Sequence, residues 1–201
     1  IDGPPTTIVM EYMTGGSTDA LCGTVKQWAT LRTIITQTLH ALQHLHNCNV
    51  LHRDLKPHNM LTQRNEGDGS LCVKLTDFGV SKVYDDLRDI DASQRTDHFR
   101  GTSAYAPPEV QMAPHVYTTM SDVFSWACCI GHLATGLRPM QHQNPPLQSG
   151  TSAFLPYSAQ DLAEVGLCLD AKVVAVLMRC FDFEKNNRPD VEDLISELTT
   201  C

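Results

Sequence analysis

Apolar residues recur at three- and four-residue intervals in several stretches of the chain, which is the period of an α-helix with one buried face. Residues 30–46 carry Leu and Ile at this spacing and are predicted to form a helix of about four to five turns. Residues 121–135 are strongly apolar and are predicted to form a helix capped by Ser121 or Asp122 and stopped at Gly136. Three shorter helices are predicted over 159–165, 171–181 and 191–198.

Short apolar stretches rich in β-branched residues, some alternating with polar ones, predict three strands. Residues 6–13, TTIVMEYM, follow a Gly-Pro-Pro break and are predicted to form the first strand. Residues 60–62 and 71–75 are predicted to form a hairpin around a loop rich in Gly, Asp and Asn. The charged stretch 85–100 has no period and is predicted to be a mobile loop. We therefore expect an α+β, mostly α-helical fold.

Composition narrows the class of protein. Of the 201 residues, 42% are hydrophobic and 19% charged, as in a folded domain. A formal net charge of −8 argues against the basic face that nucleic-acid binding needs, so we expect no nucleic-acid partner. Eight cysteines without a C-x-x-C pair favour a reduced, cytoplasmic setting over a disulfide framework. No apolar run approaches the roughly 18 residues of a membrane span, so we expect no membrane segment in this chain.

Three motifs in a fixed order suggest the chemistry. LHRDLKPHNM at 51–60 is too polar for a core strand, and its proline disfavours a helix interior. Across the predicted hairpin follows DFG at 77–79, and further on GTSAYAPPE at 101–109. Together they resemble the catalytic loop, the metal-binding triplet and the end of the activation segment of protein kinases. The resemblance extends over nearly the whole chain.

The resemblance implies how the chain is divided. Residues 1–18 would be the last strand of the N-terminal lobe and the hinge, and residues 19–201 the C-terminal lobe, with catalytic loop 52–59 and activation segment 77–109. The N-terminal lobe would be largely absent, since no glycine-rich phosphate loop and no Val-Ala-Ile-Lys strand precede the hinge. The chain also begins at Ile1, not at a methionine. We expect a fragment of a complete kinase, inactive when isolated; the alternative is a truncated, non-catalytic lobe that acts as a binding or scaffold module.

The same resemblance implies the reaction, which is transfer of the ATP γ-phosphate to a hydroxyl of a protein substrate with the aid of Mg²⁺. Asp54 would be the catalytic base that accepts the proton of the hydroxyl, and Lys56 would reach the transferring phosphate. Asn59 and Asp77 would hold magnesium, because their oxygen atoms suit a hard cation.

Four residues would form the adenine pocket. Met10 would gate its back, the backbone of Glu11 and Met13 would bond the adenine edge, and Leu61 would form the floor.

Other positions have supporting roles in kinases. Lys56 and the Gly-Thr pair at 101–102 resemble the serine/threonine-directed members, so we expect a serine or threonine acceptor. Asp122 would brace the backbone of the catalytic loop, and Glu109 and Arg188 would form a buried ion pair.

In kinases of this kind the arginine at the position of Arg53 pairs with a phosphorylated activation loop. Ser93 and Thr96 are therefore candidate phosphorylation sites, and the alternative for both is an ordinary solvated loop. The usual Ala-Pro-Glu ending reads Pro-Pro-Glu at 107–109, which we expect to stiffen the loop without abolishing activity.

A zinc site is a third candidate function. His40 and His44 stand one helical turn apart, with His46 and Cys48 close in sequence. The stretch lacks the glutamate of zinc proteases and a second ligand group, so surface histidines on a long helix are the favoured interpretation.

Overall fold

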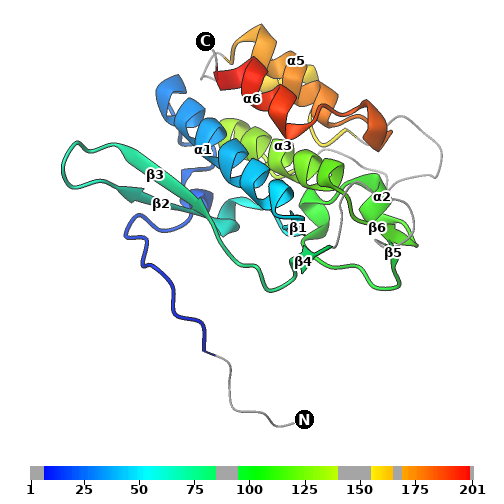
Figure 1. The fold of residues 1–201 in the computed structure, drawn as a ribbon. Helices are drawn as coiled ribbons and strands as arrows, with labels where there is room; N and C mark the ends of the chain where they lie inside the picture. Colours follow the sequence, from blue (N-terminus) through cyan, green and yellow to red (C-terminus); the bar gives the residue numbers. More distant parts are fainter. Residues whose placement is uncertain (1–6, 85–94, 140–154, 165–168, 200–201) are drawn as a thin grey trace.

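Two long helices form the centre of the protein. The computed structural model describes residues 7–84, 95–139, 155–164 and 169–199. Helices α1 (Trp28–Asn47) and α3 (Thr119–Thr135) lie side by side, with the C-terminal helices on one side and a β-hairpin on the other (Figure 1). The apolar face of α1 is fully buried, as its period predicted, through Leu31, Ile34, Ile35, Leu39 and Leu42.

Helix α3 begins two residues earlier than predicted, and its cap is Thr118. The Thr118 hydroxyl accepts a hydrogen bond from the N–H of Ser121, and the Ser121 hydroxyl accepts one from the N–H of Thr118. This reciprocal pair places Ser121 inside the first turn, so the predicted cap at Ser121 or Asp122 is wrong. Gly136 ends the helix at φ +76°, as predicted.

The C-terminal helices cover α1 and α3. The prediction is confirmed for α5 (Ala171–Cys180) and α6 (Val191–Thr199) within a residue at each end. Helix α4 (Ala159–Ala163) begins at the first residue of the predicted range 159–165 and ends two residues before its last. Residue 165 lies outside the described residues. Arg32 of α1 donates to the carbonyl of Thr199 over 3.2 Å, which ties α1 to the end of α6.

The predicted hairpin is confirmed as β2 (Met60–Arg64) paired antiparallel with β3 (Leu71–Leu75). Gln37 of α1 covers the outer edge of β3. Its amide donates to the Leu71 carbonyl over 2.8 Å and accepts from the Val73 N–H over 2.7 Å. The hairpin is thereby fixed on α1, and the loop that precedes it is fixed with it.

Two short antiparallel pairs complete the strands: β1 (Val50–Leu51) with β4 (Lys82–Val83), and β5 (Arg95–Thr96) with β6 (His115–Val116). Residues 85–94 of the predicted mobile loop lie outside the described residues, and the prediction is wrong at 95–96, which form β5. Brief helical turns are α2 (Pro108–Gln111), η1 (Thr18–Leu21), η2 (Pro57–Asn59), η3 (Ser103–Tyr105) and η4 (Lys185–Asn187).

The strand predicted over 6–13 does not form in the described residues 7–13. A strand needs a neighbour for its ladder of hydrogen bonds, and the described part of the chain supplies none for this segment. Among the described residues, backbone pairing of this segment with the hairpin begins at Gly15, whose N–H donates to the carbonyl of Thr62 over 2.8 Å. Val9 is consequently 92% exposed. In the described residues, no helix combines the length and apolarity that a bilayer crossing requires.

Candidate active site

A buried carboxylate on α3 sets the course of the catalytic loop. Asp122 is 2% exposed, and its two oxygen atoms accept the backbone N–H groups of His52 and Arg53 over 2.9 and 3.0 Å. The ring of His46, from α1, lies 3.1 Å from the same carboxylate. Burial alone raises the pKa of Asp122, but the hydrogen bond and charge of His46, then His52 and the Arg53 N–H, bring that pKa below its ordinary value. The expected bracing role of Asp122 is confirmed.

The loop is strained at the residue before the candidate base. Arg53 has φ +66°, a left-handed conformation that is rare outside glycine. Gly101 passes directly over it: a Cβ atom at Gly101 would lie 2.5 Å from the Arg53 carbonyl oxygen, and Gly101 itself has φ +105°. Only glycine meets both conditions, so the segment that starts at 101 can rest on the catalytic loop.

The contact between Gly101 and the catalytic loop brings together the candidate side chains of the two motifs. The ammonium of Lys56 donates to Asp54 Oδ2 over 2.6 Å, and the hydroxyl of Thr102 donates to Asp54 Oδ1 over 2.7 Å. Lys56 also reaches the Thr102 oxygen over 3.2 Å. Asn59 donates its amide N–H to the Asp54 carbonyl over 2.8 Å. A half-buried carboxylate thus faces an ammonium and a hydroxyl, an arrangement suited to orienting an alcohol and stabilising negative charge.

The hairpin brings Asp77 close to Asn59 in the catalytic loop. Met60 pairs with Leu75 at the start of β2, and the Thr76 N–H donates to the Asn59 carbonyl over 3.0 Å. Residues 59 and 77 therefore leave the same end of the hairpin. Asp77 has φ +65° and is exposed, with one long hydrogen bond from the Gly79 N–H to its Oδ1 at 3.4 Å.

These two side chains fit a magnesium ion by their donor chemistry. The Asn59 amide nitrogen is committed to Asp54, and within the described residues its oxygen accepts no hydrogen bond. Asp77 adds an exposed carboxylate. Across the part of the chain that the structure describes, no group of three or more His, Cys, Asp and Glu side chains could hold a metal. A cation at Asn59 and Asp77 would need further oxygen ligands from water or substrate phosphates, which is how Mg²⁺ binds at such sites.

His52 joins the catalytic loop to the 77–79 triplet. Its Nε2 lies 3.1 Å from the Thr76 carbonyl oxygen, and its ring centroid lies 5.3 Å from that of Phe78. The neighbouring Arg53 donates to the Val80 carbonyl over 2.6 Å and lies over the ring of Tyr117.

The candidate phosphorylation sites stay predictions. Ser93 lies outside the described residues, and the hydroxyl of Thr96 donates to the His98 carbonyl over 2.8 Å.

The predicted adenine-binding residues lie along the hairpin. Met10 and Glu11 are exposed, Met13 is buried, and Leu61 is half-buried. Glu11 forms an ion pair with Lys74 of β3, and the Thr76 hydroxyl contacts the Met10 sulfur at 3.8 Å. Their role in adenine binding stays a prediction.

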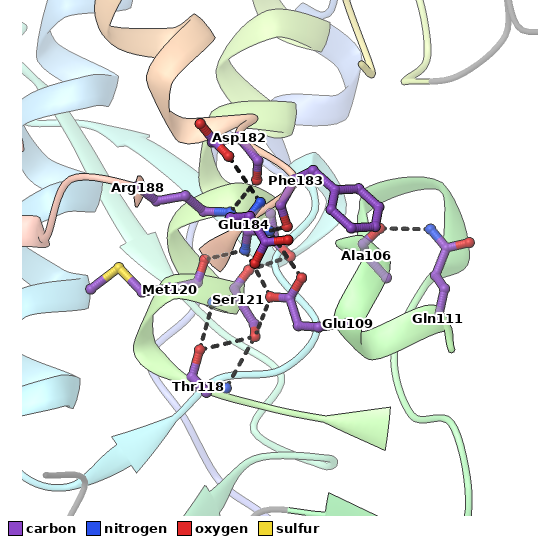
Figure 2. A network of polar contacts seen from close by, with 11 residues as sticks. Ala106, Glu109, Gln111, Thr118, Met120, Ser121, Asp182, Phe183, Glu184 and Arg188 are labelled. Atoms are coloured by element: carbon purple, nitrogen blue, oxygen red, sulfur yellow. Dashed lines mark hydrogen bonds and ion pairs between the residues drawn. The ribbon is translucent and has the colours of Figure 1, made fainter. Parts of the chain in front are cut away.

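The end of the 101–109 segment is fixed by the predicted ion pair (Figure 2). Arg188 is 4% exposed and donates to both carboxylate oxygens of Glu109, over 2.7 and 2.9 Å. It also donates to the carbonyls of Asp182, Met120 and Phe183. The Ser121 hydroxyl adds a bond of 3.0 Å to Glu109. The segment that carries Thr102 is thus held at both ends.

Two contacts were not foreseen from the sequence. The Thr102 hydroxyl bonds Asp54 across 48 residues, and only the Gly-Thr pair in the motif hinted at it. His46 is predicted to be a surface histidine, with zinc binding as the alternative, but it is half-buried against Asp122. His44 is exposed, and its Nε2 lies 3.9 Å from the Sγ of Cys48, which is also exposed.

Comparison with known proteins identifies relatives that are named as protein kinases. The family model described as protein kinase domain matches residues 3–198. The chain is 28% identical over 202 residues to a protein kinase and PP2C-like domain-containing protein of Arabidopsis thaliana, covering 87% of this chain and 30% of that protein. It is 30% identical to mitogen-activated protein kinase kinase kinase 15 of Mus musculus, covering 94% and 14%. It is 27% identical to the serine/threonine-protein kinase TNNI3K of Mus musculus, covering 96% and 22%. The chain therefore spans less than a third of the length of each of these relatives.

Proposed function

This chain belongs to the protein kinase family, and we propose that the protein transfers the γ-phosphate of ATP to a serine or threonine hydroxyl of a protein substrate. The observation that carries the proposal is the cluster of Asp54, Lys56 and Thr102, with distances of 2.6 to 3.2 Å between their polar atoms. The relative named as a serine/threonine-protein kinase supports the choice of acceptor.

Each side chain has a definite part in this proposal. Asp54 orients the substrate hydroxyl and accepts its proton, in the position where Thr102 now donates a hydroxyl hydrogen bond. Lys56 neutralises charge on the transferring phosphate. Asn59 and Asp77 would hold magnesium, which would supply positive charge to offset the charge of the ATP phosphates. Met10, Glu11, Met13 and Leu61 would contact the adenine.

Replacing the base tests the proposal. In the protein at its natural length, Asp54→Asn keeps the shape of the side chain but removes its basicity, so kcat should fall by about 10²–10⁴-fold. Steady-state transfer of labelled phosphate to a protein substrate measures this, and Asp193→Asn, an exposed change on α6, is the matched control. Unchanged turnover in Asp54→Asn would remove Asp54 from the mechanism. Nucleotide binding without turnover by the wild-type protein would favour a binding or scaffold module instead.

A further inference from the structure

The side chain of Gln111 fastens the segment that carries Thr102, and it takes no part in the chemistry described above. Gln111 is half-buried in α2, and its amide donates to the carbonyl of Ala106 over 2.7 Å (Figure 2). The same amide donates to the carbonyl of Ser103 over 3.1 Å. These two carbonyls lie at the start of η3 and just past its end, so one amide group spans the whole turn.

The two prolines that follow this turn explain why a side chain supplies the hydrogen bonds. Pro107 and Pro108 have no backbone N–H to offer. The N–H groups of Val110 and Gln111 both donate to the carbonyl of Pro107, each over 3.1 Å. The carbonyl of Ala106, a buried residue, accepts instead from the side chain of Gln111. The Pro-Pro-Glu ending thus removes backbone donors at the point where Gln111 supplies side-chain donors.

A pocket between the turn, the catalytic loop and α3 makes these side-chain bonds more important. Residues of all three elements line it, among them Thr102, Tyr105, Ala106, Asp54 and Asp122. The turn is therefore not packed closely against both of the elements that it covers. The Tyr105 hydroxyl, 2.8 Å from Nδ1 of His132, anchors its side chain to α3. The backbone of the turn is fixed by Gln111.

Gln111 links the buried ion pair to the candidate base. Its own helix is fixed by the bonds between Glu109 and Arg188. At the other side of the turn, the hydroxyl of Thr102 donates to Asp54 Oδ1 over 2.7 Å. The last N–H of the turn donates to the Thr102 carbonyl over 3.0 Å, so the position of Thr102 follows that of the turn.

We propose that Gln111 is a positioning residue for phosphoryl transfer, because its amide fixes the turn and thereby holds the Thr102 hydroxyl against Asp54. This inference rests on the proposed function. Gln111 acts through Thr102 and does not touch the reacting atoms. The predicted adenine-binding residues contact the hairpin instead, through Glu11 and Met10. Loss of the amide should therefore lower kcat and leave KM for ATP unchanged.

Replacing the amide by a thioether tests this in the protein at its natural length. Gln111→Met keeps the length of the side chain and removes both hydrogen bonds. The kcat for phosphorylation of casein should fall about two- to tenfold, the range for one hydrogen bond of ordinary strength. Gln160→Met, the same exchange at an exposed position of α4, is the matched control and should leave kcat unchanged. Gln111→Lys, which keeps a donor of similar reach, should recover most of the lost kcat.

A double variant separates positioning from a general loss of structure. Thr102→Val removes the hydroxyl and keeps the shape of the side chain. If Gln111 acts through that hydroxyl, adding Gln111→Met to Thr102→Val should lower kcat no further, whereas independent effects would multiply. Methyl NMR of labelled threonine gives a measurement that needs no turnover. The Thr102 resonance should move in Gln111→Met and stay in place in Gln160→Met.

The inference is overturned if Gln111→Met keeps the wild-type kcat, if its effect multiplies with that of Thr102→Val, or if the Thr102 resonance stays in place. Circular dichroism checks that each variant is folded, and Gln111→Asn, one methylene shorter, replaces Gln111→Met should that variant unfold. Any of these results, obtained while Asp54→Asn still abolishes turnover, refutes the positioning role alone. If Asp54→Asn turns over normally, the proposed function fails instead, and the Thr102 resonance alone reports whether Gln111 fixes the turn.

Discussion

The buried ion pair between Glu109 and Arg188 supports a quantitative prediction. Arg188→Met preserves much of the volume of the side chain but removes every donor, leaving the Glu109 carboxylate, 16% exposed, without its cation. Three backbone carbonyls lose a hydrogen bond at the same time. Breaking one partner of a buried pair costs about 3–5 kcal/mol. For a domain of this length that corresponds to a fall in Tm of about 6–20 °C.

Urea unfolding followed by circular dichroism measures the loss, and the chain offers its own control. Arg179 also contacts both carboxylate oxygens of its partner, Glu197, at 2.9 Å to each from one guanidinium nitrogen, but the side chains are 49% and 34% exposed. Arg179→Met should therefore lower the free energy of unfolding by less than about 1 kcal/mol. In the double variant Arg188→Met with Glu109→Leu, part of the loss should be recovered, because no unpaired charge remains buried. Equal destabilisation by Arg188→Met and Arg179→Met would refute the argument from burial.

Two further predictions concern the catalytic loop. Gly101→Ala should destabilise the fold by at least about 1–2 kcal/mol and lower kcat, because its Cβ would strike the Arg53 carbonyl at a positive φ; Gly67→Ala, which meets nothing within 4 Å, is the matched control for unfolding and turnover. Because the folded-state pKa of Asp122 lies below its ordinary value of 3.8, its stabilisation is present above that pH and is lost as the pH falls further. The fall in the free energy of unfolding at acid pH should thus be less steep in Asp122→Asn, and an unchanged slope would show that folding does not lower the pKa of Asp122.

The sequence predicted the elements whose signal is local. The period of α1 and the turn-rich loop between β2 and β3 each depend on residues close in the chain, and both predictions are confirmed. The strand predicted over 6–13 was wrong in its described part, residues 7–13, because strand formation depends on a neighbour, which no local pattern contains. The cap of α3 was misplaced by a related error: Ser121 is a good cap residue, but Thr118 makes the reciprocal bonds.

The candidate site was predictable only through the resemblance of its motifs. The bond from Thr102 to Asp54 spans 48 residues, and the contact of His46 with Asp122 spans 76. Spacing and periodicity do not encode such contacts, since they arise when α1, α3 and the hairpin pack together. A histidine on a helix surface and a histidine bracing a carboxylate have the same local sequence signal, so His46 could not be assigned before the packing was known.

Backbone strain explains why local reasoning fails most at the catalytic loop. Three described residues other than glycine have positive φ, and two of them, Arg53 and Asp77, lie at the candidate site. Each such residue costs about 1–3 kcal/mol and persists only where its surroundings hold it. For Arg53 they do: Asp122 binds its N–H, Val80 accepts from its side chain, and Gly101 lies against its carbonyl. The stability of α3 and of the 101–109 segment thus compensates for a conformation that sequence propensity disfavours, and that conformation turns Asp54 towards Lys56 and Thr102.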